Sequence, residues 1–197
     1  DDPRTRVGGV ATVARNLELV FERVEFMTPK TLDLSRLRRE RLPLVCDNHW
    51  ALAVPASIPV IGFQHGVAKE KFSQTRSLGD LKLAVRQKKA ARRDNVLWVA
   101  CAEWIGRTFG QLHGNAAKHV IYHQVDLARF DGRLDNGGSR LVLHDGRNPH
   151  KGAKLLAALS KALPDWDFQP LACAPEAVPD RLRRARAFLH LSRYEGN

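Results

Sequence analysis

Hydrophobic and polar positions along this chain follow two alternating periods, which predict strands and helices in turn. Short apolar runs, typical of buried strands, occur in the first part of the sequence at residues 23–28, 43–48, 58–63, 96–101 and 118–122. Segments with apolar residues at helical spacing lie among them, at residues 11–22, 80–93 and 102–113. Strands that alternate with helices are typical of a parallel sheet covered by helices, so we expect an α/β fold.

The alternation breaks once and then resumes. Residues 131–139 are rich in Gly, Asp and Asn, which indicates a linker and a domain boundary. Beyond this segment we expect strands at 140–145, 167–172 and 187–191, and helices at 151–163 and 179–185. The sequence therefore predicts two parallel-sheet domains, residues 1–131 and 132–197.

One strand-to-helix turn carries candidate chemistry. An apolar strand from Leu141 runs into a Gly146-Arg147 turn, and Lys151-Gly152 follows at the head of a helix. Cations beside the positive end of a helix dipole cost roughly a few tenths of a kcal/mol unless an anion lies between them. Phosphate is the usual anion at such a position, so this turn is a candidate phosphate site.

Several segments together resemble the retaining GT-B glycosyltransferases of glycosyltransferase family 4. These are the turn with Arg147 and Lys151, and the strand that ends in Ser192-Arg-Tyr-Glu-Gly196. They occur in the family's order with three more segments, Val7-Gly-Gly-Val10, Val60-Ile-Gly-Phe-Gln-His-Gly66 and Val120-Ile-Tyr-His-Gln-Val-Asp-Leu-Ala-Arg-Phe130. The resemblance implies a GT-B fold of two Rossmann-like domains, an N-terminal acceptor-side domain and an incomplete C-terminal domain that binds the nucleotide-sugar.

The resemblance also implies an activity. It is the transfer of a hexosyl-type sugar, with retention of configuration, from a nucleotide-diphosphate-sugar to a glycan or lipid-linked acceptor, as in polysaccharide biosynthesis. In the family, Arg and Lys at the positions of Arg147 and Lys151 hold the donor diphosphate in place of a metal. We therefore expect no metal and no cofactor besides the nucleotide-sugar co-substrate. The implied catalytic residues are His65, Arg147, Lys151 and Glu195, and the implied donor-binding residues are Gly8, Gly9, Gly146, Arg147, Lys151, Ser192 and Glu195.

Each of these residues has a plainer interpretation. His65 is also consistent with a structural histidine at a strand end, and Glu195 with a turn-capping carboxylate at the surface. Arg147 and Lys151 are also consistent with a pair of surface cations. The chain departs from the family pattern as well. Leu191 stands where a Pro is usual, His123-Gln124 replaces Asn-Gly, and the second Glu that the family pairs with Glu195 is absent. We therefore expect this sequence to be a fragment of a longer enzyme.

The charge balance predicts an anionic partner. The chain has 32 Lys and Arg against 21 Asp and Glu, a formal charge of +11. Part of the excess lies in residues 36–41 and 181–186. Lys82, Arg86, Lys89 and Arg93 follow helical spacing and form one basic stripe, which favours a membrane-surface face. A solvated helix face remains the alternative.

Two other function classes stay open, a basic module that binds nucleic acid or another anionic surface without catalysis, and a noncatalytic scaffold. Aromatic residues are only 7% of the chain and do not interleave with the basic clusters, which disfavours the nucleic-acid interpretation. The three isolated cysteines are typical of reduced, buried thiols. The histidines other than His49 and His65, including His144, His150 and His190, show no metal-ligand spacing. No membrane-spanning run or signal peptide is present, so we expect a cytoplasmic protein, peripheral at the inner face of the membrane.

Overall fold

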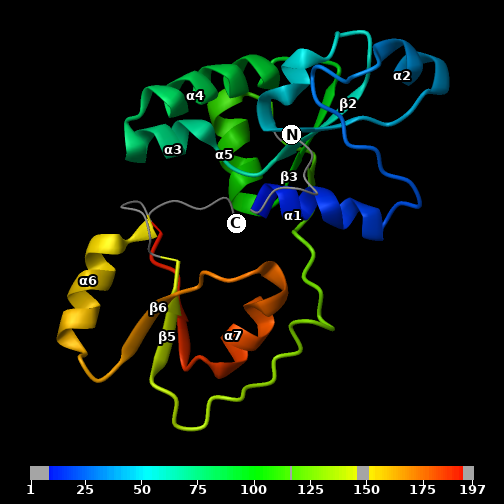
Figure 1. The fold of residues 1–197 in the computed structure, drawn as a ribbon. Coiled ribbons are helices and arrows are strands. Elements are labelled where there is room, and N and C mark those ends of the chain that lie inside the picture. The colour runs from blue at the N-terminus through cyan, green and yellow to red at the C-terminus, as the bar shows by residue number, and fades with distance from the viewer. Residues whose placement is uncertain (1–8, 116, 146–150, 193–197) are drawn as a thin grey trace. The chain divides into compact units, whose positions relative to one another are not determined.

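The computed structural model describes residues 9–115, 117–145 and 151–192 (Figure 1). The chain divides into two compact units, of which the first ends at Gln124 and the second begins at Val125. Each unit is built on a parallel sheet with helical connections, so the expected α/β class is confirmed.

The first unit contains, in its described residues, a four-stranded parallel sheet in the order β1-β2-β3-β4. Its strands are β1 (Val45–Asp47), β2 (Val60–Gln64), β3 (Val96–Ala100) and β4 (His119–Val120). Three of these strands lie within a run expected to be a strand, and β2 extends one residue beyond its predicted run of 58–63. Since the order follows the sequence and all neighbours are parallel, the carboxyl ends of these strands share one edge of the sheet.

Helical segments connect these strands. They are η3 (Asn48–Ala53), α3 (Ala68–Thr75), α4 (Leu78–Ala91) and α5 (Glu103–His113). Because each connection advances to the next strand in the same direction, right-handed crossovers place these segments on one face of the sheet. The hydrophobic core lies there, with Trp98, Ile105 and Phe109 at 1% exposure or less.

The region before β1 departs from expectation. Helix α1 (Gly9–Asn16) ends earlier than predicted and continues as the short helix η2 (Leu17–Leu19). The predicted strand at residues 23–28 is wrong, because a strand needs a hydrogen-bonded neighbour and no described strand pairs with this segment. Helices α2 (Leu34–Glu40) and α3 were not predicted, since both are short and mostly polar.

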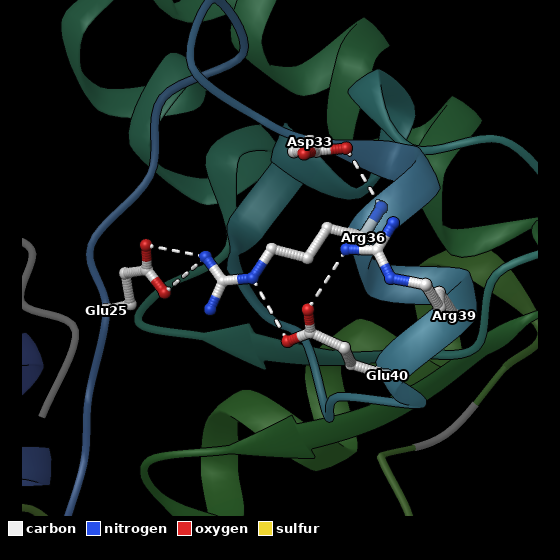
Figure 2. Close-up of polar contacts among 5 residues, drawn as sticks. All are labelled: Glu25, Asp33, Arg36, Arg39 and Glu40. Atoms are coloured by element: carbon white, nitrogen blue, oxygen red, sulfur yellow. Dashed lines mark hydrogen bonds and ion pairs between the residues drawn. The ribbon is translucent and has the colours of Figure 1, made fainter.

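Helix α2 shows how one basic cluster is neutralised (Figure 2). The Asp33 side chain accepts a hydrogen bond from the Arg36 backbone N–H at 2.9 Å and caps the helix. The Arg36 guanidinium pairs with Glu25 at 2.9 Å and with Glu40 at 3.0 Å, and Arg39 pairs with Glu40 at 3.2 Å. The pKa of Glu25 and that of Glu40 are both lowered, chiefly by the hydrogen bonds that Arg36 donates to them. Much of this cluster's charge is therefore balanced within the unit.

The second unit forms, in its described residues, a three-stranded parallel sheet in the order β6-β5-β7. Its elements are β5 (Leu141–His144), α6 (Ala153–Ala162), β6 (Asp167–Pro170), η5 (Pro175–Ala177), α7 (Val178–Arg184) and β7 (Ala187–Leu189). In Figure 1, α6 and α7 flank this sheet on opposite sides. That arrangement agrees with right-handed crossovers that run in opposite directions, the first from β5 to β6 and the second from β6 past β5 to β7.

The Gly- and Asp-rich segment at residues 131–139 is bonded to the second unit. The backbone N–H of Asp135 donates to the Arg183 carbonyl at 2.9 Å, and the Asn136 side chain donates to the Ala185 carbonyl at 3.2 Å. Arg183 also pairs with Asp180 at 2.6 Å and with Asp131 at 3.5 Å. Arg183, from the basic cluster at residues 181–186, therefore makes its contacts within the second unit.

Candidate functional site

The second unit has a topological switch point. The chain leaves β5 to form β6 on one side and returns to form β7 on the other side of β5. In open parallel sheets, ligands bind outside the carboxyl ends of the strands at such a point, because the connections diverge there and leave a crevice. Lys151 follows β5 and Ser192 follows β7, so two predicted donor-binding residues lie at this edge.

The two segments touch at Gly152. This residue caps α6 in the left-handed conformation with φ of 81°. A Cβ atom at Gly152 would lie 2.5 Å from Leu191 Cβ and 2.7 Å from the Leu191 carbonyl oxygen. Only glycine fits there without displacing the backbone, and its small size brings Lys151 and Ser192 to the same edge of the sheet.

Asp145 organises the polar groups of this edge. Its Oδ2 atom lies 3.4 Å from Lys151 Nζ and 2.8 Å from His190 Nδ1. Its Oδ1 atom and the Ser192 hydroxyl are buried and have no hydrogen-bond partner within the described ranges. Buried polar atoms are usually satisfied, so these two groups are candidates for ligand contacts. Asp145 also offsets the charge of Lys151, so an anion here needs a further cation.

The remaining predicted residues of this site are not among those described at this edge. Gly8, Gly146, Arg147 and Glu195 are outside the described residues. Gly9 is the first residue of α1, in the first unit.

A second cluster lies at the carboxyl edge of the first unit's sheet. His65 follows β2, Cys101 follows β3, and His123 comes shortly after β4. The ligand atoms of these three side chains lie within 4.8 Å of one another. Asp47, the last residue of β1, brings a carboxylate to the same edge. The predicted position of His65 at a strand end is thus part of a larger cluster.

Burial sets the protonation of this cluster. The His65 side chain is 12% exposed, and its Nε2 atom lies 3.4 Å from Asp47 Oδ1. Its Nδ1 atom is buried without a hydrogen-bond partner among the residues described. Burial, with a smaller effect of His123, lowers the pKa of His65 to about 4, and burial raises the pKa of Asp47 to about 6. At neutral pH, therefore, His65 is a neutral imidazole.

The cysteine of this cluster is also uncharged in the absence of a cation. Cys101 is 2% exposed, and burial raises the pKa of its thiol to about 11. The Phe63 ring contacts both imidazoles, with centroid separations of 4.8 Å to His65 and 6.1 Å to His123. An aromatic wall therefore lines one side of the two histidines.

Gln87 of α4 holds the loop that carries His65. Its side-chain oxygen accepts from the Ala68 backbone N–H at 2.8 Å, and its amide donates to Gln64 Oε1 at 2.7 Å and to the Gly66 carbonyl at 2.8 Å. Gln87 is 2% exposed although it lies among the cations of α4. No sequence pattern predicts this role, because a single Gln in a basic helix is typical of a solvated position.

The other face of α4 is exposed and mixes cations with apolar side chains. Lys82, Arg86 and Lys89 surround a shallow hollow whose remaining wall is Leu81 and Val85. The predicted stripe ends before Arg93, which lies beyond the helix and donates to the Val54 carbonyl at 2.7 Å and to Asn95 at 3.0 Å. Leu78, in the first turn, is 76% exposed.

Sequence reasoning missed most of the first unit's cluster. Its members come from four different strand ends, so no local motif joins them, and the histidines were expected to show no metal-ligand arrangement. The cysteine prediction was partly wrong, since Cys46 and Cys101 are buried but Cys173 is exposed. A parallel-sheet prediction that aligned the strand ends would have placed His65 and Cys101 on one edge.

Comparison with models of known protein families finds no match, and comparison with functionally characterised proteins finds none either. Function is therefore inferred from the residues and their geometry. Among the described helices, none is both long enough and apolar enough to cross a bilayer.

Proposed function

We propose that this chain is a retaining glycosyltransferase with a GT-B fold, which transfers a sugar from a nucleotide-diphosphate-sugar to a glycan or lipid-linked acceptor. The observation that carries the proposal is the switch point of the second unit. There, Gly152 packs against Leu191 at the carboxyl ends of β5 and β7. The two segments that resemble the family's donor site in sequence are thus neighbours in space, where a parallel sheet binds ligands.

The proposed chemistry follows from charge. Cleavage of a glycosyl phosphate develops negative charge on the leaving oxygen, so a fixed cation beside that oxygen stabilises the transition state more than the ground state. Lys151 is one such cation, and Arg147, outside the described residues, is the expected second one. Because Asp145 lies 3.4 Å from Lys151, we expect both cations to be needed for net attraction of a diphosphate.

Replacing Lys151 by alanine is expected to weaken nucleoside diphosphate binding by about ten-fold, the equivalent of one charge-assisted hydrogen bond. Thermal shift against a panel of nucleoside diphosphates and nucleotide-sugars measures this, and the ligand that gives the largest shift identifies the base. Arg147→Ala is expected to weaken nucleoside diphosphate binding to a similar extent. Transfer is then followed as release of nucleoside diphosphate from the selected donor.

Lys161→Ala is the matched control, because Lys161 is an exposed cation in the last turn of the same helix. Equal weakening by Lys151→Ala and Lys161→Ala would indicate nonspecific attraction to a basic protein. Absence of any nucleotide shift in the unmodified chain would count against the glycosyltransferase proposal.

The exposed face of α4 supports a membrane-bound acceptor as part of the same proposal. Cations beside exposed apolar side chains are typical of helices that lie in a bilayer interface. Within the described residues, Lys82, Arg86 and Lys89 form no ion pair, so their charge remains available to anionic lipid. In contrast, Arg36, Arg39 and Arg183 are paired with carboxylates.

Substituting Lys82, Arg86 and Lys89 together by glutamine is expected to weaken binding to phosphatidylserine vesicles by about a hundred-fold, since each cation near an anionic surface contributes about 1 kcal/mol. Vesicle co-sedimentation measures this. The control variant carries the same loss of charge at Lys154, Lys161 and Arg184, all exposed in the second unit. Equal losses in both variants, or tighter binding to single-stranded RNA or DNA than to vesicles, would favour the alternative of a nucleic-acid-binding module.

A further inference from the structure

The carboxyl edge of the first unit's sheet gathers two imidazoles and a thiol. These are His65, Cys101 and His123, whose ligand atoms lie within 4.8 Å of one another. His65 and Cys101 directly follow β2 and β3, and His123 comes shortly after β4, so the order of the strands brings all three to one edge of the sheet. The ladder even continues to the cysteine, whose backbone N–H donates to the Gln64 carbonyl at 3.1 Å.

We infer that His65, Cys101 and His123 bind a Zn²⁺ ion. Imidazole nitrogen and thiolate sulfur are the donors that Zn²⁺ prefers, whereas Mg²⁺ and Ca²⁺ require oxygen ligands. Three protein ligands leave a fourth tetrahedral position for water or for an anionic ligand. All three ligands belong to the first unit, whereas the residues of the proposed diphosphate site belong to the second.

The distances require only a small adjustment. Ligand atoms at about 2.0–2.3 Å from a tetrahedral Zn²⁺ lie about 3.3–3.6 Å from one another. The observed limit of 4.8 Å therefore exceeds the required separation by about 1.2–1.5 Å. Rotation of the half-buried His123 side chain closes such a gap without moving the strands.

A carboxylate orients one of the ligands. Asp47 Oδ1 lies 3.4 Å from His65 Nε2 and accepts a hydrogen bond from the Asn48 amide at 2.8 Å. This places Nε2 beside the carboxylate and assigns the buried Nδ1, which has no partner among the described residues, to the metal. A carboxylate behind a metal-bound imidazole is a common arrangement, because it fixes the ring and raises its basicity.

Metal binding also changes the state of the thiol. Cys101 is 2% exposed, and zinc binds a cysteine as its thiolate. Coordination replaces the S–H bond by a Zn–S bond and releases the proton to solvent. The buried Cys101 is thereby converted from an inert thiol into a bound thiolate.

Titration of the full chain with Co²⁺, which takes the place of Zn²⁺, tests this inference. We expect one equivalent to produce a thiolate-to-cobalt charge-transfer band, together with the intense visible bands of tetrahedral cobalt, and Zn²⁺ to abolish both. Cys101→Ala is expected to remove the charge-transfer band. His123→Gln is expected to weaken Co²⁺ binding at least ten-fold, and Asp47→Asn about ten-fold.

Matched controls are available for both ligand types. His119→Gln changes an exposed histidine on β4, and Cys173→Ser removes the exposed cysteine. Both are expected to leave the spectrum unchanged.

Because Cys101→Ala alters a buried position, circular dichroism checks that this variant folds. His123→Gln provides a second result at a half-buried position. Absence of the charge-transfer band in the unmodified chain, or its loss in Cys173→Ser with retention in Cys101→Ala, would overturn the inference. Nucleotide binding is measured separately, so either proposal stands or fails alone.

Discussion

Alanine at position 152 is expected to destabilise the second unit by about 3 kcal/mol. The left-handed conformation at Gly152, with φ of 81°, costs a residue with a Cβ roughly 1–2 kcal/mol. The new Cβ would also lie 2.7 Å from the Leu191 carbonyl oxygen, and relief of such overpacking costs about 1–3 kcal/mol. Hydrogen exchange of the β5 and β7 amides measures the effect, because it reports each unit separately.

Two other glycines of the same unit separate these contributions. Gly138 has φ of 73° but no atom within 4 Å of an added Cβ, so Gly138→Ala isolates the backbone cost of about 1 kcal/mol. Gly137 has open space and no positive φ, so Gly137→Ala is expected to be nearly neutral. If Gly152→Ala lowers stability by no more than Gly138→Ala, Gly152 does not pack closely against Leu191. The support that this packing gives to the proposed donor site would then be lost as well.

Methionine in place of Gln87 is expected to destabilise the first unit by about 3 kcal/mol. Methionine keeps the length and volume of glutamine but makes none of its hydrogen bonds. The Ala68 N–H, the Gly66 carbonyl and the Gln64 side chain would each lose a buried partner. An unsatisfied buried polar group costs about 1–3 kcal/mol, and adjustment of the loop recovers part of the total.

Hydrogen exchange of the β2 and β3 amides measures this second effect. Lys88→Met, at the exposed neighbouring position of α4, is the control and is expected to change stability by less than about 0.5 kcal/mol. Gln87→Met also tests whether Gln87 positions His65, because loss of the hydrogen bond to the Gly66 carbonyl should weaken Co²⁺ binding. The exposed His119 and Cys173 are not altered by this substitution. Normal stability together with normal cobalt binding would show that the loop is held by other contacts.

Much of the α/β pattern was predictable because it is local. The strands near residues 60, 96 and 141 are short apolar runs with turn residues at their ends, and α4 is a periodic helix whose Ser77 side chain accepts from the Asp80 N–H at 3.1 Å. The predicted strand at 23–28 failed because strand formation depends on a neighbour elsewhere in the chain. The same dependence explains why Arg93 is not part of the predicted stripe, since it donates a hydrogen bond to the carbonyl of Val54, which lies far from it in sequence.

The sequence by itself determined the alternation of strands and helices, the excess of positive charge and the residue types at each strand end. The tertiary structure decided which strand ends are neighbours. The order β6-β5-β7 puts Lys151-Gly152 against Leu191-Ser192, and the order β1-β2-β3-β4 gathers His65, Cys101 and His123. Sheet order depends on hydrogen bonds between residues far apart in the chain, and no local pattern encodes those pairings. For that reason the sequence identified single candidate residues, while the fold alone assembled them into sites.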